Sequence, residues 1–175
     1  AALRRAAAHR ERTFGTAHLA TARTYGNLAV VLEALGRRDD AFATQLAALR
    51  ALRGAVGPEH PNVLTLMNNL AVTLAYAGQF DEAERIYLDV YRIRRDLLGL
   101  EHGDTLTVLE NIGDTYEDQG RLGEAEALLR DVVARRLRAG GLDPLREGGA
   151  LESLAGVVQQ RRGPEARRHE IGLRA

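Results

Sequence analysis

The segment MNNLAVTLAYAGQFDEAE, residues 67–84, decides the fold because two closely similar segments occur in the same chain. YGNLAVVLEALGRRDDAF lies 42 residues earlier, at 25–42, and LENIGDTYEDQGRLGEAE lies 42 residues later, at 109–126. Self-similarity at a fixed period of this length is typical of arrays of small structural repeats. We therefore expect a repeat protein in which one unit recurs every 42 residues.

The period divides the whole chain as a single repeat domain. Full copies occupy residues 15–56, 57–98 and 99–140, residues 1–14 align with the second half of a preceding copy, and residues 141–175 form a degenerate or capping copy. Because the first copy is only a half, we expect this chain to be a segment of a longer protein.

Each copy contains two amphipathic helical segments. In the second copy an apolar face follows the i, i+3, i+4, i+7 spacing of a helix, at Met67, Leu70, Ala71 and Leu74. Gly78 then interrupts the pattern, and the acidic residues after it favour a new helix start. Two such helices cannot cover their own apolar faces, so neighbouring copies must stack. The predicted fold is all-α, an α-solenoid of antiparallel helix pairs.

Composition argues against catalysis. The chain has no cysteine and no lysine, which excludes thiolate and Schiff-base chemistry, and its one serine, Ser153, lies within a predicted helix without a nucleophile elbow. No apolar run is long enough for a membrane span, and no basic stripe with aromatic residues indicates nucleic-acid binding. We expect a cytoplasmic protein that is not an enzyme and needs no cofactor.

Two sets of ionisable residues recur in register and could be mistaken for sites. His18, His60 and His102 lie on successive copies, too far apart for one metal ion, and we expect them to satisfy backbone groups at helix starts. Glutamates also pair in the first turns of the second helices, where the helix dipole favours carboxylates. We expect these to be exposed and not an acid–base pair; they are Glu82, Glu84, Glu124 and Glu126.

The repeat resembles the tetratricopeptide repeat (TPR), in the 42-residue form found in kinesin light chains and in many bacterial regulators. The residues that match are Met67, Leu70, Ala71, Leu74, Gly78 and Ala83 in copy two, and Leu109, Ile112, Gly113, Tyr116, Gly120 and Ala125 in copy three. The resemblance implies a protein- or peptide-binding scaffold whose first helices line a concave groove. It also implies an inter-helix hydrogen-bonding role for the column Asn27, Asn69 and Asn111, with direct contact to a ligand as the alternative.

One flank of each first helix remains free for a partner. The candidate partner-binding residues are Arg23, Asn68, Val72, Tyr76, Glu110, Asp114, Glu117, Asp118 and Glu152. Copy three places four of its nine carboxylates on this flank, against five arginines in the whole copy. Like charges at i, i+3 and i, i+4 destabilise a helix by roughly 0.2–0.5 kcal/mol per pair. A basic partner segment would compensate that cost, with Asn68 and Tyr76 holding its backbone and an apolar side chain; a plain solvated surface is the alternative.

Two further functions stay open from the sequence. An uncapped solenoid end could mediate self-association. The resemblance to bacterial regulators also suggests an intramolecular sensor arm of a larger signalling ATPase or transcription regulator.

Overall fold

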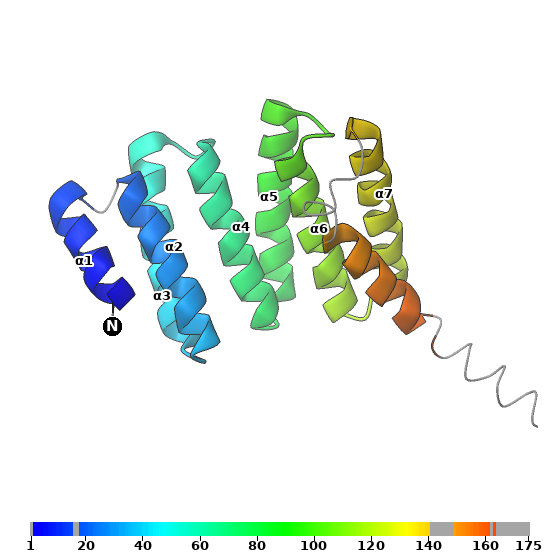
Figure 1. Cartoon of the computed structure of the whole chain (residues 1–175), viewed down its shortest axis with the longest axis horizontal. Coiled ribbons are helices and arrows are strands. Elements are labelled where there is room, and N and C mark those ends of the chain that lie inside the picture. The colour runs from blue at the N-terminus through cyan, green and yellow to red at the C-terminus, as the bar shows by residue number, and fades with distance from the viewer. Residues whose placement is uncertain (1, 16–17, 141–148, 162, 164–175) are drawn as a thin grey trace, which may run out of the picture. The chain divides into compact units, whose positions relative to one another are not determined.

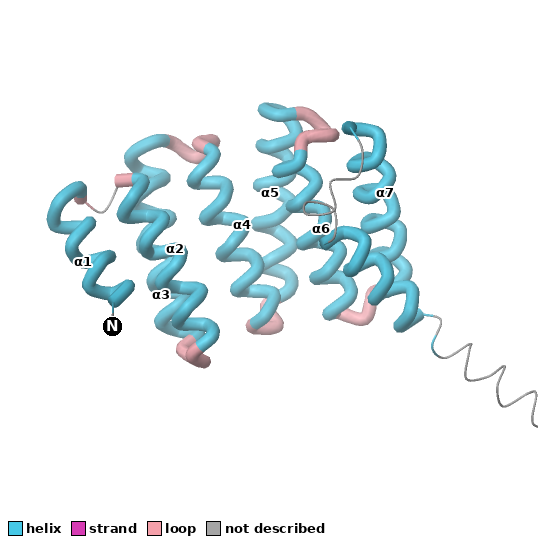
Figure 2. Tube along the Cα trace, viewed as in Figure 1, coloured by secondary structure: helices cyan, strands magenta, loops and turns pink. Residues whose placement is uncertain are grey.

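The computed structural model describes residues 2–15, 18–140, 149–161 and 163. All of the regular structure in these ranges is α-helical (Figure 2). The helices are α1 (Ala2–Phe14), α2 (Leu19–Ala34), α3 (Arg38–Val56), α4 (Pro61–Tyr76), α5 (Phe80–Leu98), α6 (Gly103–Asp118) and α7 (Leu122–Gly140), and residues 149–161 form one more. Residues 141–148 and the expected second helix of the last copy lie outside the described residues.

The helices follow the 42-residue period without a slip. The first helices of the copies begin at Leu19, Pro61 and Gly103, and the second helices begin at Arg38, Phe80 and Leu122. Consecutive helices within a copy run in opposite directions (Figure 1). The expected all-α solenoid of helix pairs is therefore confirmed.

Glycines with positive φ close the turns inside the copies. Gly36, Gly78 and Gly120 have φ between +72° and +76°, a left-handed conformation that costs a residue with a side chain about 1–2 kcal/mol. Each follows the end of a first helix by two residues, so the pair is joined by a turn of the same geometry every time. Glycine at this column is thus required by the backbone.

Histidines cap the first helices, as the sequence predicts. His60 Nδ1 accepts a hydrogen bond from the backbone N–H of Asn62 at 3.2 Å, and His102 Nδ1 accepts one from Asp104 at 3.1 Å. His18 Nδ1 accepts in the same way from Ala20 at 3.1 Å. A helix N-terminus has four N–H groups without an intrahelical partner, and in each copy the imidazole satisfies one of them.

The chain forms two compact units, Ala1–Ile86 and Tyr87–Ala175. In the first, α2 packs against α1, α3 and α4, and α3 packs against α4. Its core includes a cluster of small and branched residues from three helices: Ala7, Leu28, Ala29, Leu32 and Ala41. A buried hydrogen bond from Gln45 Nε2 to Thr73 Oγ1, 2.9 Å long, joins α3 to α4.

The second unit packs α6 against α7 and adds the helix at 149–161. Ala125 and Leu129 of α7 form a cluster with Val157 of the last helix. Gly113 of α6 lies so close to α7 that a Cβ there would be 2.8 Å from Leu129 Cγ and Cδ2. The side chain of Arg94 in α5 bonds to the start of α6, where its Nη1 donates to the backbone carbonyl of Asp104 at 2.9 Å.

Within the described ranges, no helix combines the length and the apolar character needed to cross a bilayer.

Candidate binding surface

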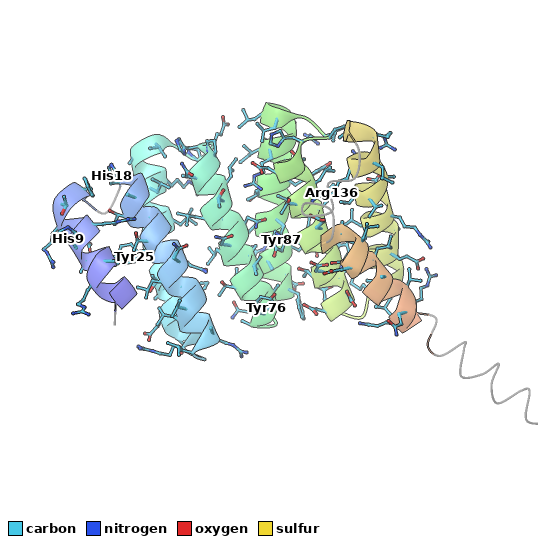
Figure 3. The ribbon with its side chains drawn as sticks, in the orientation of Figure 1. His9, His18, Tyr25, Tyr76, Tyr87 and Arg136 are labelled. Atoms are coloured by element: carbon cyan, nitrogen blue, oxygen red, sulfur yellow. The ribbon has the colours of Figure 1, made fainter. Side chains whose placement is uncertain are left out.

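The acidic flank of α6 begins with an ion pair to the second helix of its own copy. Glu110 Oε2 accepts from Arg136 Nη2 of α7, and the same nitrogen lies 3.4 Å from Thr107 Oγ1. Both charged side chains are largely covered, at 13% and 12% exposure. Figure 3 shows Arg136 near α6 and α7. The carboxylate predicted to face a partner is thus already engaged inside the unit.

The helix at 149–161 covers the next part of the flank. Asp114 accepts a hydrogen bond from the hydroxyl of Ser153. Glu117 Oε1 accepts from Gln160 Nε2 at 2.6 Å. Gly156 lies beside this contact, and a Cβ there would be in ordinary van der Waals contact with Glu117 Oε1, at 3.5 Å. Two polar contacts therefore join α6 to the last helix along the acidic stripe.

Burial changes the acidity of these groups. Desolvation raises the pKa of Glu110, and Arg136 opposes the shift without cancelling it. Desolvation also raises the pKa of Asp114, with a further upward contribution from Asp118. The pKa of Glu117 is raised by desolvation and then by its two acidic neighbours. The charges on this flank are consequently costly to the fold.

The expectation of a wholly free acidic flank is therefore corrected. Glu110, Asp114 and Glu117 are partly buried with intramolecular partners, whereas Asp118 and Glu152 are exposed. Among the described residues no arginine pairs with Asp118 or Glu152. The accessible negative charge of this surface, which we name the acidic rim, is made by Glu117, Asp118 and Glu152.

The remaining predicted residues lie in the first unit. Arg23 belongs to α2, but its side chain lies outside what the structure describes. Asn68 and Val72 of α4 do not form the free flank expected, because Asn68 is only 9% exposed and Val72 is half-buried. Tyr76, at the C-terminal end of α4, is 69% exposed (Figure 3).

Sequence reasoning missed two apolar side chains exposed in the first unit. Val31 and Leu35, at the end of α2 and just beyond it, are 40% and 67% exposed. Val31 stands where copies two and three have Thr73 and Thr115, which are buried and hydrogen-bonded to their own helices. The departure from threonine in this column is the signal that could have identified Val31.

The first-turn glutamates differ from expectation at two positions, since Glu84 is half-buried and Glu126 is buried. Glu124 is exposed and pairs with Arg121, but Glu126 is only 6% exposed. Its two oxygens accept from Arg130 of α7 and Arg161 of the last helix, both at 2.5 Å. Glu126 was expected to be solvated because nothing nearby in the sequence indicates the helix that covers it.

The recurring polar columns are candidate metal ligands or hydrogen-bonding residues. No three histidine, aspartate or glutamate side chains there are grouped so as to hold a metal ion. The inter-helix role of Asn27, Asn69 and Asn111 stays a prediction, although Asn111 does have a partner.

The chain matches the family model of the tetratricopeptide repeat over residues 26–96 and again over 69–138, which together exceed half of its length. No match was found among curated proteins. The structure of BtubC (BKLC) from P. vanneervenii is similar, with 22% identity, coverage of 89% of this chain and 65% of that chain, and a TM-score of 0.69.

Two crystal structures from Podosopora anserina, of the nearly identical TPR-like repeats of a protein described as a kinesin light chain, are also similar. Both are 23% identical to this chain. One covers 98% of this chain and 81% of its own, with a TM-score of 0.72. The other covers 96% and 79%, with a TM-score of 0.70. The chain thus spans just under two thirds of BtubC and about four fifths of the other two. It belongs to the tetratricopeptide repeat family, and its fold is similar to that of the kinesin-light-chain repeats.

Proposed function

We propose that this chain is a non-catalytic scaffold that binds a protein or peptide segment and prefers a basic one. TPR arrays generally serve as protein-interaction scaffolds. The observation that supports a basic partner is the acidic rim, where the exposed carboxylates of Asp118 and Glu152 have no arginine partner among the described residues. Arginine and lysine side chains are the groups that satisfy such carboxylates by charge-assisted hydrogen bonds.

Tyr76 supports an apolar component of recognition. Its ring is 69% exposed, and tyrosine at an interface contributes a large contact area together with a hydroxyl that can hydrogen-bond. We propose that it contacts an apolar side chain of the partner, while Asn68 and Val72 shape the α4 surface beneath that contact. Arg23 of α2 completes the proposed set in this unit.

Charge reversal of the exposed carboxylates tests the proposal. Reversing Asp114, which is partly buried, would disturb the fold, so the informative variant is Asp118→Arg with Glu152→Arg. The matched control is Glu59→Arg with Asp81→Arg, which changes the net charge equally at two other exposed positions. Fluorescence polarisation would follow labelled arginine-rich peptides and the same peptides with glutamate in place of arginine.

We expect the basic peptides to bind the unaltered chain at least tenfold more tightly than the acidic ones, with affinity falling as salt rises. The rim reversal should remove that preference and the control should keep it. Equal affinity for both peptide sets, or a rim reversal that binds basic peptides as well as the control does, would refute the basic preference.

Self-association and a role as a regulatory arm stay predictions. A mass that is independent of protein concentration, measured by light scattering, would exclude the first.

A further inference from the structure

A groove of about 330 Å³ opens among α1, α2 and α3 of the first unit. Glu11 of α1 forms one wall and Tyr25 of α2 reaches into it, while α3 supplies Asp40 and a run of alanines. The volume lies at the lower end of the range of small-molecule pockets, roughly 300–1,000 Å³. Tyr25 extends from α2 toward α1 (Figure 3). None of the residues that line the groove is among those proposed to bind a peptide.

The groove exists because copy one has small residues where the other copies have large ones. Thr44, Ala48 and Ala51 line it on α3. The residues 42 positions later are Ile86, Val90 and Ile93, and those 84 positions later are Leu128, Val132 and Arg135. The missing branched side chains leave space over α2 that the repeat pattern otherwise fills. Methyl groups of the alanines of α3 form the floor of the groove. Such an apolar surface favours an aliphatic ligand.

The polar walls of the groove are acidic. Tyr25 donates its hydroxyl hydrogen to Glu11 Oε2 at 2.6 Å. That bond, with burial and the negative charge of Glu11, raises the pKa of Tyr25 to about 12, so the phenol keeps its proton at neutral pH. In the described part of the chain no arginine pairs with Glu11, whereas Asp40 pairs with Arg37.

Glu11 is therefore a carboxylate held in place by a neutral donor, and no described side chain supplies a cation to balance it. The residues that line the groove include two carboxylates and no basic side chain. A ligand with a cationic nitrogen and a short hydrocarbon chain complements both the acidic walls and the apolar floor of the groove.

We propose that the groove formed by α1, α2 and α3 binds a small aliphatic amine. The protonated amine donates to the carboxylate of Glu11, the phenol of Tyr25 fixes that carboxylate, and the hydrocarbon lies over the methyl groups of Ala48 and Ala51. A charge-assisted bond of this kind is roughly twice as strong as a neutral hydrogen bond. The site is independent of the proposed peptide-binding function, because it uses a different set of residues.

The test uses three ligands of one length on the purified full chain. Hexylamine, 1-hexanol and hexanoate share the hydrocarbon and differ in charge, and binding is followed by chemical-shift changes and by calorimetry. We expect hexylamine to bind at least tenfold more tightly than hexanol, and hexanoate not to bind. Equal affinity of the amine and the alcohol, or no binding of the amine, would overturn the proposal.

Two variants locate the binding. Glu11→Gln keeps an acceptor for Tyr25 and removes the charge, so it should abolish the preference for the amine. Thr44→Ile with Ala51→Ile introduces the side chains that copy two has in register and should abolish binding of both hexylamine and hexanol. Glu59→Gln, at an exposed position in the linker before α4, is the matched control and should bind as the unaltered chain does. Circular dichroism confirms that each variant is folded, and retained amine binding in the filled variant would also overturn the proposal.

Discussion

Gly113→Ala should destabilise the chain although alanine is the better helix former. The glycine lies inside α6, and the corresponding residues of the other copies are Ala29 and Ala71, both fully buried. An alanine is therefore compatible with the repeat in general. The difference at Gly113 is its neighbour Leu129, whose Cγ and Cδ2 would each lie 2.8 Å from the new Cβ.

The magnitude follows from two opposing terms. Exchanging glycine for alanine within a helix favours folding by about 1 kcal/mol. Adding a methyl group to a packed core costs about 1–3 kcal/mol, because side chains and backbone must move. Leu129 is fully buried and its Cγ is not the free end of a flexible chain, so the cost belongs in the upper part of that range. The expected net loss is about 1–2 kcal/mol.

Gly54→Ala is the matched control. Gly54 lies inside α3, and a Cβ there would meet nothing within 4 Å. Only the helix-propensity term applies, and the variant should gain up to about 1 kcal/mol. Urea and thermal unfolding followed by circular dichroism would measure both, with about 2–4 °C of Tm per kcal/mol for a chain of this size. If Gly113→Ala matched or exceeded the stability of Gly54→Ala, the close approach of α6 to Leu129 would be refuted.

Three further predictions concern single side chains. Asp114→Asn should stabilise by about 0.6–1.5 kcal/mol at pH 7, because it removes three like-charge pairs on α6, with Glu110, Glu117 and Asp118, worth roughly 0.2–0.5 kcal/mol each. Since the raised pKa of Asp114 means that the folded state takes up the proton more readily, the gap between variant and parent should close as pH falls; a gap that persisted in acid would contradict this. His60→Ala should cost about 1 kcal/mol by removing the cap of α4, whereas His9→Ala, on the exposed surface of α1, should cost almost nothing in the same thermal scan. Tyr25→Phe should lower the free energy of unfolding by at most about 1 kcal/mol below pH 10, because solvent screens the bond to Glu11. As the pH rises from 10 toward 12, only the parent should lose this stabilisation, because the pKa of Tyr25 in the folded state is raised to about 12.

The helices could be predicted from the sequence because their determinants are local. Gly78 ends one amphipathic stretch, and the residues after it begin the next. The histidine caps follow from the same locality, since His60 accepts from a backbone N–H only two residues away. Because each of these local patterns occurs at the same position in three copies, every copy supports the same prediction.

The cover over the acidic flank could not be predicted because its contacts are distant in sequence. Glu117 meets Gln160 across 43 residues, and Glu126 meets Arg161 across 35. The helix that supplies these partners departs from the repeat pattern and contains Gly156. Its packing therefore cannot be predicted by aligning it with the other copies. The acidic residues of α6 share one helix face, as the spacing predicts. Their exposure depends on how the degenerate last copy packs against that face.

The groove in the first unit is an intermediate case. The small residues Thr44, Ala48 and Ala51 are visible in the alignment of the copies. Whether neighbouring side chains close over such a gap depends on the position of α1, and that is a property of the packed structure. The hydrogen bond between Tyr25 and Glu11 joins residues 14 apart on different helices, and no local pattern specifies it.

The left-handed glycines at 36, 78 and 120 have a consequence for how such a gene can change. Excising or inserting the 42 residues between two of them rejoins the backbone at a turn of the same conformation. Unequal recombination between the copies would then lengthen or shorten the array by whole helix pairs.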